Sequence, residues 1–562
     1  MATPRNALQE HDIEVAELQH ELNVELVPGT EIMTDLGHVH FARSGDKVLV
    51  PQPHNHPNDP LNWSKPWKLV IMFGQFLVAF VHAVGPLSVA PQAKYYMNEW
   101  DRSLAEVLQF IGVCILVFGF SNFIWVPIAT KWGRRPSLLA SAIMGIGACI
   151  WRAEARSYGS MMGACIVHGI AAGPSETLPP MLISDVMFLH ERGLYMGLYM
   201  WAYFGAYQIG PVVSGVMSQR YGWRSFWWFN VAAYILLTLY TILLIPETKW
   251  NRGAGTIVSD SKADKNGSCT IDKGAIDGQQ EIVSESSEKP DAVACNYSNV
   301  VEITHRDEYI YMGRPSREQF KFISNTALGY DDGLLRSIWV PIKLFAFPII
   351  EWASFVFSWS ASCFLAMNLT QSQAFAAPPY NFDPSRIGYF NLAMFAGSTA
   401  GLLAAGPLSD WISMRATKKN RGIREPEMRL PALIPFTFAL IAGTLVASYG
   451  YTNGWKWEII VIIGYFLIGM QVASIPAVAT TYAIDCYKPV AGDFLVSATV
   501  IKNLWGYLFS KYLTHWIDKI GYETPLCLNM AICVLWILFA VPLYFFGKRV
   551  RRWSKDSSVH HS

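Results

Sequence analysis

The chain has 562 residues, of which 52% are hydrophobic and only 15% are charged. An ordinary water-soluble protein carries about 25% charged residues, so the composition excludes a string of soluble domains and favours a chain that mostly faces lipid. Lys and Arg number 44 against 43 Asp and Glu, a balance that gives no electrostatic reason to expect a nucleic-acid partner.

The first part of the chain is a polar tail followed by six apolar segments. Residues 1–67 are predicted to be a disordered cytosolic tail, and they end in Asp59-Pro60-Leu61-Asn62-Trp63. Crossing a bilayer takes about 20 apolar residues. Segments of about that length lie near residues 69–90, 107–130, 136–152, 160–187, 194–218 and 224–246. They predict an N-terminal six-helix bundle over residues 68–246.

A polar stretch then separates this bundle from six further apolar segments. Residues 247–336 contain a run rich in Ser, Glu and Asp (276–292), which cannot bury a core and predicts a disordered cytosolic linker. The later apolar segments lie near residues 338–366, 387–409, 430–450, 457–481, 490–514 and 524–547. They predict a C-terminal six-helix bundle over residues 337–547, followed by a basic cytosolic tail over 548–562.

The basic residues set the predicted orientation. Loops on one side carry most of them, and this excess marks the cytosolic side and places both termini there. The basic residues on that side include Lys131, Arg134, Arg135, Arg192, Arg415, Lys418, Lys419, Arg421, Arg424 and Arg429. We expect a multi-pass protein of the plasma membrane, with the vacuolar membrane as the alternative.

The two groups of segments repeat each other. The loop after span 2 contains Trp132-Gly133-Arg134-Arg135, and the loop after span 8 contains Gly406-Pro407-Leu408-Ser409-Asp410. Asp185 ends span 4 and Asp485 ends span 10. Matching features at matching spans indicate two related halves. The predicted fold class is therefore an all-α membrane protein with twelve transmembrane helices in two pseudo-symmetric six-helix bundles.

At these residues the chain resembles the major facilitator superfamily. Gly133, Arg134 and Arg135 match the end of that family's loop signature, while Thr130 and Lys131 replace its usual Asp and Arg. The stretch Gly210-Pro211-Val212-Val213-Ser214-Gly215 in span 5 is similar to an antiporter signature. Asp59–Trp63, His190–Gly193 and Gly422–Leu430 resemble a fungal drug:proton antiporter branch, which includes polyamine and histidinol permeases and metabolite exporters.

Two acids in the apolar segments are the first candidates for chemistry. An ionisable group at bilayer depth costs about 2.5–3.5 kcal/mol, so it is a functional candidate by default. Glu176 lies among prolines in span 4 and could carry a proton or pair with a cationic substrate, or simply be held by nearby hydroxyls. Glu351 in span 7 is the second candidate, with hydration near the cytosolic end as the alternative.

Other polar residues within the spans complete the candidate proton and substrate site. Lys502 and Asn503 lie near the middle of span 11, where Lys502 could pair with either acid or extend along the helix to an interface. An unperturbed histidine titrates near neutral pH, so His82 and His168 are candidates, although both could equally be packing residues. Uncharged residues that could line a cavity are Gln208, Asn391 and Gln471.

A separate group of charges lies at the cytosolic ends of the spans. The resemblance implies a gating latch, in which an acid at the end of span 4 pairs with the basic loop after span 2. Charge that only sets topology is the alternative. The latch candidates are Lys131, Gly133, Arg134, Arg135 and Asp185 in the first half and Asp410, Arg415 and Asp485 in the second.

Two further predictions concern structure and modification. Gly205, Gly210, Pro211 and Gly215 would form a hinge or allow close helix packing in span 5. Asn368-Leu369-Thr370 is a glycosylation candidate. The nine cysteines include no CxxC pair, and no nucleotide-binding or hydrolase motif is present, so we expect no metal, no cofactor and no enzymatic activity.

The predicted function is proton-coupled transport by alternating access, with export of small organic molecules such as drugs or fungal secondary metabolites. Uptake of polyamine-like or other organic cations by the same scaffold is the alternative, and a non-transporting nutrient sensor ranks below both. The expected partners are the lipid bilayer, a small-molecule substrate and protons, and we expect a monomer.

Overall fold

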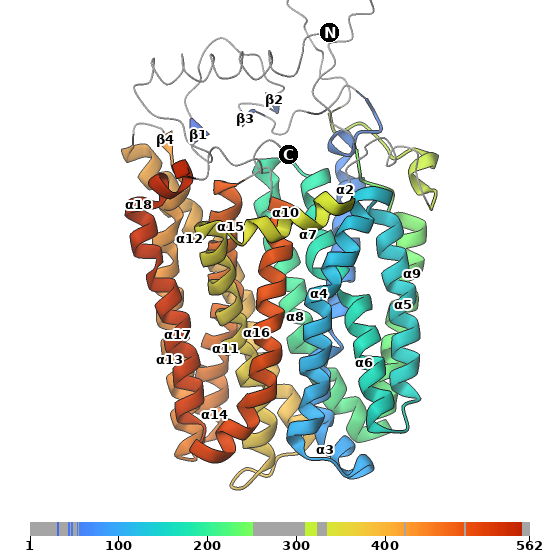
Figure 1. Cartoon of the computed structure of the whole chain (residues 1–562), viewed down its shortest axis with the longest axis vertical. Coiled ribbons are helices and arrows are strands. Elements are labelled where there is room, and N and C mark those ends of the chain that lie inside the picture. The colour runs from blue at the N-terminus through green and yellow to red at the C-terminus, as the bar shows by residue number, and fades with distance from the viewer. Residues whose placement is uncertain are drawn as a thin grey trace, which may run out of the picture.

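The structure is a computed structural model that describes residues 31–32, 43–44, 47–48, 53, 56–250, 310–322, 334–420, 423–487 and 491–553. Most of the predicted terminal tails (1–67 and 548–562) and of the predicted linker (247–336) lies outside these residues. The described helices run roughly parallel to one long axis (Figure 1). We call the end where α2 begins and α18 ends the terminal end, and the opposite end the distal end.

The first half consists of the helices before the linker. Their bounds are α2 (Lys65–Ala83), η2 (Pro86–Ser88), α3 (Val89–Trp100), α4 (Leu104–Trp132), α5 (Arg134–Ala153), α6 (Tyr158–Ala172), α7 (Pro174–Val186), α8 (Leu189–Tyr221) and α9 (Trp223–Leu244). Local sequence explains several ends: Ser103 and Glu106 cap the start of α4 reciprocally, and Gly133 ends it with a φ of 110°.

The second half follows the linker. Its helices are α10 (Leu334–Leu344), α11 (Pro348–Ala376), α12 (Pro384–Lys419), η4 (Pro426–Ala432), α13 (Leu433–Thr452), α14 (Trp457–Ile459), the π-helical turn η5 (Ile460–Tyr465), α15 (Phe466–Cys486), α16 (Ala491–Ile520), α17 (Glu523–Leu538) and α18 (Ala540–Trp553). The short strands β1 (Glu31–Ile32) and β4 (Ile423–Arg424) pair antiparallel, as do β2 (Arg43–Ser44) and β3 (Lys47–Val48).

Within the described residues, nine helical segments are long and apolar enough to cross a membrane. The broken pair α6 and α7, together with α8 and α16, completes the twelve predicted spans. A lipid-facing helix must be apolar, whereas a helix that packs against the other half can carry polar groups. The less apolar α8 and α16 pack on α12 and α4 respectively and so join the halves.

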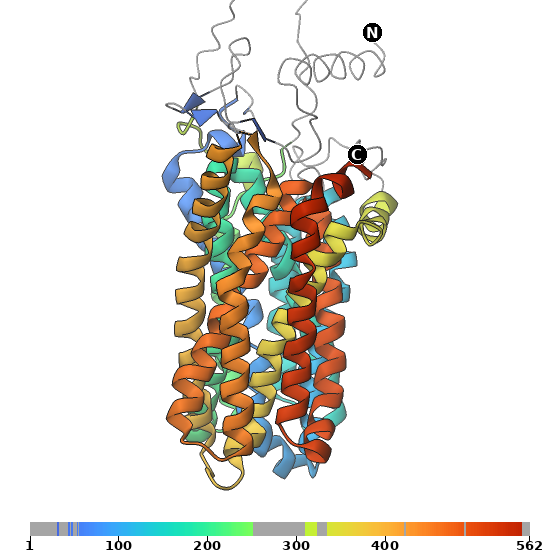
Figure 2. The same cartoon turned by 90° about the vertical axis from the view of Figure 1, so that its left-hand side faces the viewer.

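The structure differs from the predicted boundaries in two places. The predicted span over 338–366 is two elements, because the chain turns before Pro348: α10 lies across the bundle near the terminal end, and α11 runs to Ala376 (Figures 1 and 2). Residues 310–322, which the composition of their surroundings assigns to a disordered linker, contain η3 (Arg317–Phe320) and pack on the first half.

Candidate functional site

A break in the fourth span positions Glu176. Gly173 separates α6 from α7, and Pro174 occupies the first turn of α7. A residue in this position makes no intrahelical bond through its N–H, so the N–H that proline lacks is not missed. Glu176 lies in the same turn. The N–H of Glu176 donates to the Gly173 oxygen at 3.2 Å. The positive end of the helix dipole favours a negative side chain in the first turn, so the break in the helix suits a buried carboxylate at this position.

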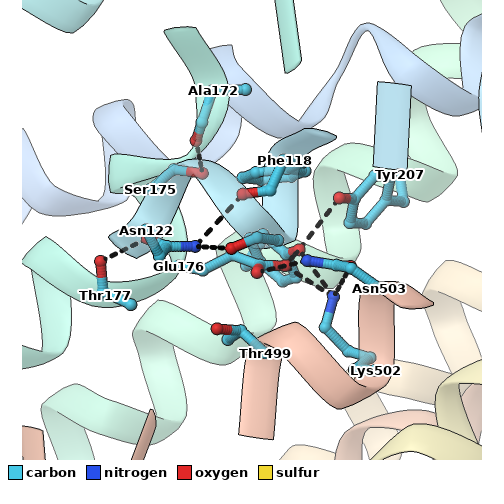
Figure 3. A network of polar contacts seen from close by, with 12 residues as sticks. Phe118, Asn122, Ala172, Ser175, Glu176, Thr177, Tyr207, Thr499, Lys502 and Asn503 are labelled. Carbon is cyan, nitrogen blue, oxygen red and sulfur yellow. Dashed lines mark hydrogen bonds and ion pairs between the residues drawn. The ribbon is translucent and has the colours of Figure 1, made fainter. Parts of the chain in front are cut away.

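Glu176 pairs with Lys502 across the two halves of the molecule. The Lys502 Nζ lies 2.6 Å from Glu176 Oε1, and Asn503 donates its Nδ2–H to Glu176 Oε2 at 2.8 Å. Glu176 is 3% exposed and Lys502 is 8% exposed. Figure 3 shows Lys502 and Asn503, both from α16, pointing towards Glu176 from α7. The pair therefore joins the first half to the second inside the bundle.

Tyrosines of α8 surround this pair. Tyr203 donates its hydroxyl to Glu176 Oε1, and its oxygen lies 2.9 Å from the hydroxyl of Tyr207. Tyr199 donates to the backbone oxygen of Ser175 at 2.9 Å. Lys502 has a further acceptor in Asn503 Oδ1 at 2.8 Å. Each charged atom of the pair thus has several partners, which is what a buried ion pair needs to offset its loss of hydration.

A small cavity adjoins the pair at the interface between the halves. Its volume is about 40 Å³, and Tyr207, Lys502 and Asn503 form its polar wall. Apolar side chains from both halves form the rest, among them Ile115, Phe204, Phe364 and Leu365. A drug-sized ligand needs a few hundred Å³, so this conformation has room for a few water molecules only.

The remaining ionisable candidates lie apart from the pair. Glu351 lies in the first turn of α11, and its Oε1 is buried with no hydrogen-bond partner among the described residues. His168 and His82 are fully buried in the first half, His168 against the Tyr234 hydroxyl at 3.1 Å and His82 against the Val78 oxygen at 2.9 Å. Neither histidine lines the cavity.

Three uncharged candidates take different positions. Gln208 accepts a hydrogen bond from Ser398 at 2.9 Å and so links α8 to α12. Gln471 accepts one from Ser360 at 2.8 Å within the second half. Asn391 donates to the Gly388 oxygen at 3.2 Å, also within the second half. Of the three, only Gln208 lies between the halves.

The prediction of a glycosylation site at Asn368 is wrong. Asn368 lies inside α11 and is fully buried, and its side chain donates to the Phe364 oxygen at 3.1 Å. A glycan needs an accessible asparagine on the surface, and a buried helical position leaves no room for one.

The ion pair predicted for a first-half latch is present at the terminal end. Arg134 Nε lies 3.1 Å from Asp185 Oδ2. Arg135 instead donates to the Ile245 and Ile242 oxygens at the end of α9, and Lys131 lies over the ring of Trp132. Sequence reasoning missed Glu247, whose carboxylate accepts the backbone N–H groups of Arg134 and Arg135 at 2.9 and 3.1 Å.

In the second half, Asp410 and Asp485 pair with a different arginine from the one predicted. Arg429 lies 2.9 Å from both Asp410 Oδ1 and Asp485 Oδ2. Arg415 lies over the ring of Trp411 instead, because it follows Trp411 by one helical turn on α12. Arg429, which lies in η4 fourteen positions after Arg415, therefore makes the ion pairs predicted for Arg415.

A second ion cluster holds that loop to the last helix. Arg551 donates to Glu425 at 2.6 Å and to Glu427 at 2.8 Å. Burial opposes the charged form of Glu425, but the bonds from Arg551 and Lys548 outweigh it and lower the pKa of its carboxyl. No motif in the sequence marks these residues, because the partners are more than 120 positions apart.

Glycines bring α8 and α12 together towards the distal end. A Cβ at Gly215 would lie 2.7 Å from the Pro384 oxygen, and one at Gly388 would lie 2.7 Å from the Pro211 oxygen. Gly205 packs on Phe395 of α12, whereas Gly210 packs on Val84 and Ser88 of its own half. Of the glycines predicted to act in a hinge or in close packing, Gly205 and Gly215 therefore contact the other half, whereas Gly210 packs within its own half.

Comparison with known proteins gives the family. A sequence model described as Major Facilitator Superfamily matches residues 71–492. An uncharacterized MFS-type transporter of Schizosaccharomyces pombe is 26% identical, with 94% of each chain covered. Protein HOL1 of Saccharomyces cerevisiae is also 26% identical, with 91% of each covered. Efflux pump radE of Floropilus chiversii is 21% identical over 88% of this chain and 83% of its own.

A solved structure agrees in fold. The human organic anion transporter MFSD10 superposes with a TM-score of 0.50 and 12% sequence identity, covering 86% of this chain and all of that one. The family match spans most of the chain and includes the helices that carry Glu176, Arg134 and Asp185. This chain is therefore a membrane transporter, not an enzyme, and belongs to the Major Facilitator Superfamily.

Proposed function

We propose that this chain is a proton-coupled secondary transporter that exports small organic molecules by alternating access. The observation that carries the proposal is the buried pair of Glu176 and Lys502, which joins the two halves beside a cavity. A charge pair between two moving halves can make their separation depend on a proton, because protonation removes one of its two charges.

The geometry supports a mutually exclusive use of Glu176. In the structure its two carboxylate oxygens are already bonded to Lys502, Asn503 and Tyr203. A proton placed on Glu176 takes away the anionic partner of Lys502, and a bound cationic substrate would compete for the same oxygens. When a proton and a substrate cannot both hold one site, their movements are exchanged, which is antiport.

The closed contacts between the halves support alternating access. Ser372 of α11 donates to the Ala90 oxygen of α3 at 3.1 Å, and the glycine contacts of α8 and α12 lie nearby towards the distal end. These backbone approaches close the distal end in this conformation. Rocking the halves would break these contacts and open the distal end.

We further propose the plasma membrane as the location, with the terminal end in the cytosol. The basic residues of the terminal end support this orientation by the positive-inside rule. Described examples are Lys131, Arg134, Arg135, Arg415, Lys418, Lys419, Arg424, Arg429, Lys548 and Arg551. The name of the relative radE, an efflux pump, favours export as the direction.

Uptake of organic cations is the second candidate, because the surroundings of Lys502 suit an ammonium group. The Lys502 Nζ lies 2.8 Å from Asn503 Oδ1 and 5.7 Å from the ring centres of both Tyr203 and Phe357. A carboxylate, an amide oxygen and two ring faces are the groups that recognise an alkylammonium ion. A substrate amine could occupy them once Lys502 withdraws.

Proteoliposomes with an imposed pH gradient separate the two candidates. Antiport predicts that a hydrophobic fluorescent cation or an uncharged dye accumulates when the lumen is acidic. Proton-coupled uptake predicts that spermidine accumulates when the outside is acidic. Glu176→Gln should abolish either movement, whereas the matched change Glu106→Gln, at an exposed acid in the first turn of α4, should not. Absence of both substrate and proton movement in the unaltered protein would refute the coupled mechanism.

A further inference from the structure

The segment from Ile310 to Phe322 lies on the first half although it follows α9 by more than 60 residues. Gly313 donates its N–H to the Asn62 oxygen at 2.9 Å and accepts from the N–H of Ser64 at 3.0 Å. A Cβ at Gly313 would collide with the Pro57 oxygen, so this approach requires glycine. The segment is therefore bonded to the backbone that leads into α2, within the Asp59–Trp63 motif that the transport site does not use.

Gln319 extends this contact to the end of α9. It is fully buried, its Nε2 donates to the Asn58 oxygen at 3.1 Å, and its backbone oxygen accepts from the N–H of Glu247 at 2.7 Å. One residue of the late linker thus bonds to the segment before α2 and to the segment after α9. Removing a buried polar group with this many partners is costly, because each partner would lose a hydrogen bond.

Glu247 carries the contact on to the latch. It is 1% exposed, and its two carboxylate oxygens accept the N–H groups of Arg134 and Arg135 at the start of α5, a favourable place for a negative charge. Arg134 in turn donates to Asp185 at 3.1 Å. A continuous path of hydrogen bonds therefore runs from Gln319 through Glu247 and Arg134 to Asp185.

Aromatic side chains of the same segment contact both elements that the latch connects. Tyr311 packs against Phe188, in the connection between α7 and α8, at 5.9 Å between ring centres. Phe320 packs against Trp67 at 6.2 Å, and the Arg135 guanidinium lies 5.6 Å from its ring centre. The segment lies against the α4–α5 turn on one side and the end of α7 on the other.

We propose that residues 310–322 and 57–64 form a clasp that positions the Arg134–Asp185 latch, with Gln319 and Glu247 as its positioning residues. In this proposal residues 310–322, at the end of the linker, act on the Arg134–Asp185 latch, and residues 251–309 are not needed for that action. The expected effect on flux rests on the proposed transport function. The expected effect on the hydrogen bonds of the Arg134 and Arg135 amides at the start of α5 does not. The clasp would let events on the linker reach the gate through Gln319.

Hydrogen exchange and transport measured on the full chain in lipid test this proposal. In Gln319→Ala we expect the amides of Arg134 and Arg135 to exchange about tenfold faster, because loss of the side-chain bonds from Gln319 Nε2 to the Asn58 and Glu247 oxygens loosens the segment that holds Glu247. We expect the maximal transport rate to change with little change in the half-saturating substrate concentration, since the substrate site is untouched. Lys321→Ala, an exposed neighbour, and deletion of residues 260–300 should change neither quantity.

The outcomes separate the clasp from the proposed function. Unchanged exchange at Arg134 and Arg135 in Gln319→Ala would overturn the clasp, whatever the transport result. Faster exchange with an unchanged transport rate would overturn the positioning role and leave the transport function standing. Failure of the unaltered protein to transport any compound would count against the proposed function alone, and exchange would still decide the clasp. Should Gln319→Ala not fold, Gln319→Glu provides the same comparison with the side chain length kept.

Discussion

The charged contacts at the centre and at the terminal end differ in what they join. The central pair links α7 of the first half to α16 of the second, with both partners buried. The pairs at the terminal end link elements within one half: Arg134 with Asp185, and Arg429 with Asp410 and Asp485. The latter are partly open to water, and Asp410 is 60% exposed.

This difference assigns the contacts different parts in a cycle. In the proposed alternating-access cycle a contact between the halves would have to break when they rock, so its strength would set a barrier that a proton or substrate could lower. A contact within one half can persist throughout and keep that half rigid. The central pair is therefore expected to control coupling, and the terminal pairs to control the shape of each half.

Removing one partner of the central pair should have the largest effect. In Lys502→Met, Glu176 keeps a buried charge without its cation, so we expect the free energy of unfolding to fall by about 3–5 kcal/mol. Transport should be lost, because the link between the halves no longer depends on a proton. Thermal unfolding in detergent and flux in proteoliposomes measure the two effects.

The double variant Glu176→Gln/Lys502→Met sharpens this test. Without either charge the stability should return towards that of the unaltered protein, since burial of an unpaired ion is what destabilises the single variant. Transport should stay absent. If the double variant still moves substrate against a pH gradient, the pair is structural and control of coupling lies elsewhere.

The two terminal clusters should differ in how much one arginine contributes. Arg429→Ala removes two charged contacts, and we expect a loss of about 2–3 kcal/mol of unfolding free energy. Arg134→Ala removes one ion pair and should cost about half as much. Thermal unfolding of both variants ranks them. No loss in Arg134→Ala would mean that the backbone bonds to Glu247, and not the side chain of Arg134, hold the first-half loop.

Contact between the halves at the distal end gives the next smaller effect. Gly388→Leu would force a side chain against the Pro211 oxygen, and overpacking of this kind costs about 1–3 kcal/mol. The closed distal end should suffer most. A cysteine introduced at Ser372, which contacts the Ala90 oxygen across the halves, should then react faster with a membrane-impermeant thiol reagent.

Gly406→Leu is the matched control for that variant, because a Cβ at Gly406 would meet nothing within 4 Å. It lies on the same helix and should leave the reactivity of the introduced cysteine unchanged. Equal reactivity in both variants would show that close packing at Gly388 does not keep the distal end shut.

The sequence predicts the fold well because lipid imposes a simple rule on it. The length of each apolar segment identifies most spans. The helices α8 and α16 are less apolar than the nine segments that meet this criterion, but their places between other spans still predict them. Glu176 and Lys502 could be singled out because an ionisable residue at bilayer depth is costly. Their pairing, with Asn503 and Tyr203, could only be seen once α7 and α16 were packed together.

Other residues escaped prediction for a physical reason. Glu247 and Arg551 lie in polar stretches of the sequence near the ends of helices. A charged residue is ordinary in such a stretch and gives no indication of a buried partner. Their partners are more than 100 positions away and are set by tertiary packing. The same holds for Gln319, an uncharged residue in a segment whose neighbours indicate disorder, and for Asn368, whose sequon gives no information about burial.

The smallest effect is expected for the pair of Arg224 and Glu99 at the distal end. Their closest atoms are 2.6 Å apart, as in the central pair, but the side chains are 41% and 35% exposed and belong to the same half. Surface pairs of this kind contribute about 0–1 kcal/mol, because water stabilises the separated ions almost as well. Arg224→Ala should therefore leave flux unchanged and lower the unfolding temperature slightly or not at all. A loss of flux comparable to that of Lys502→Met would mean that short distance alone, and not contact between buried groups of opposite halves, decides which charges govern transport.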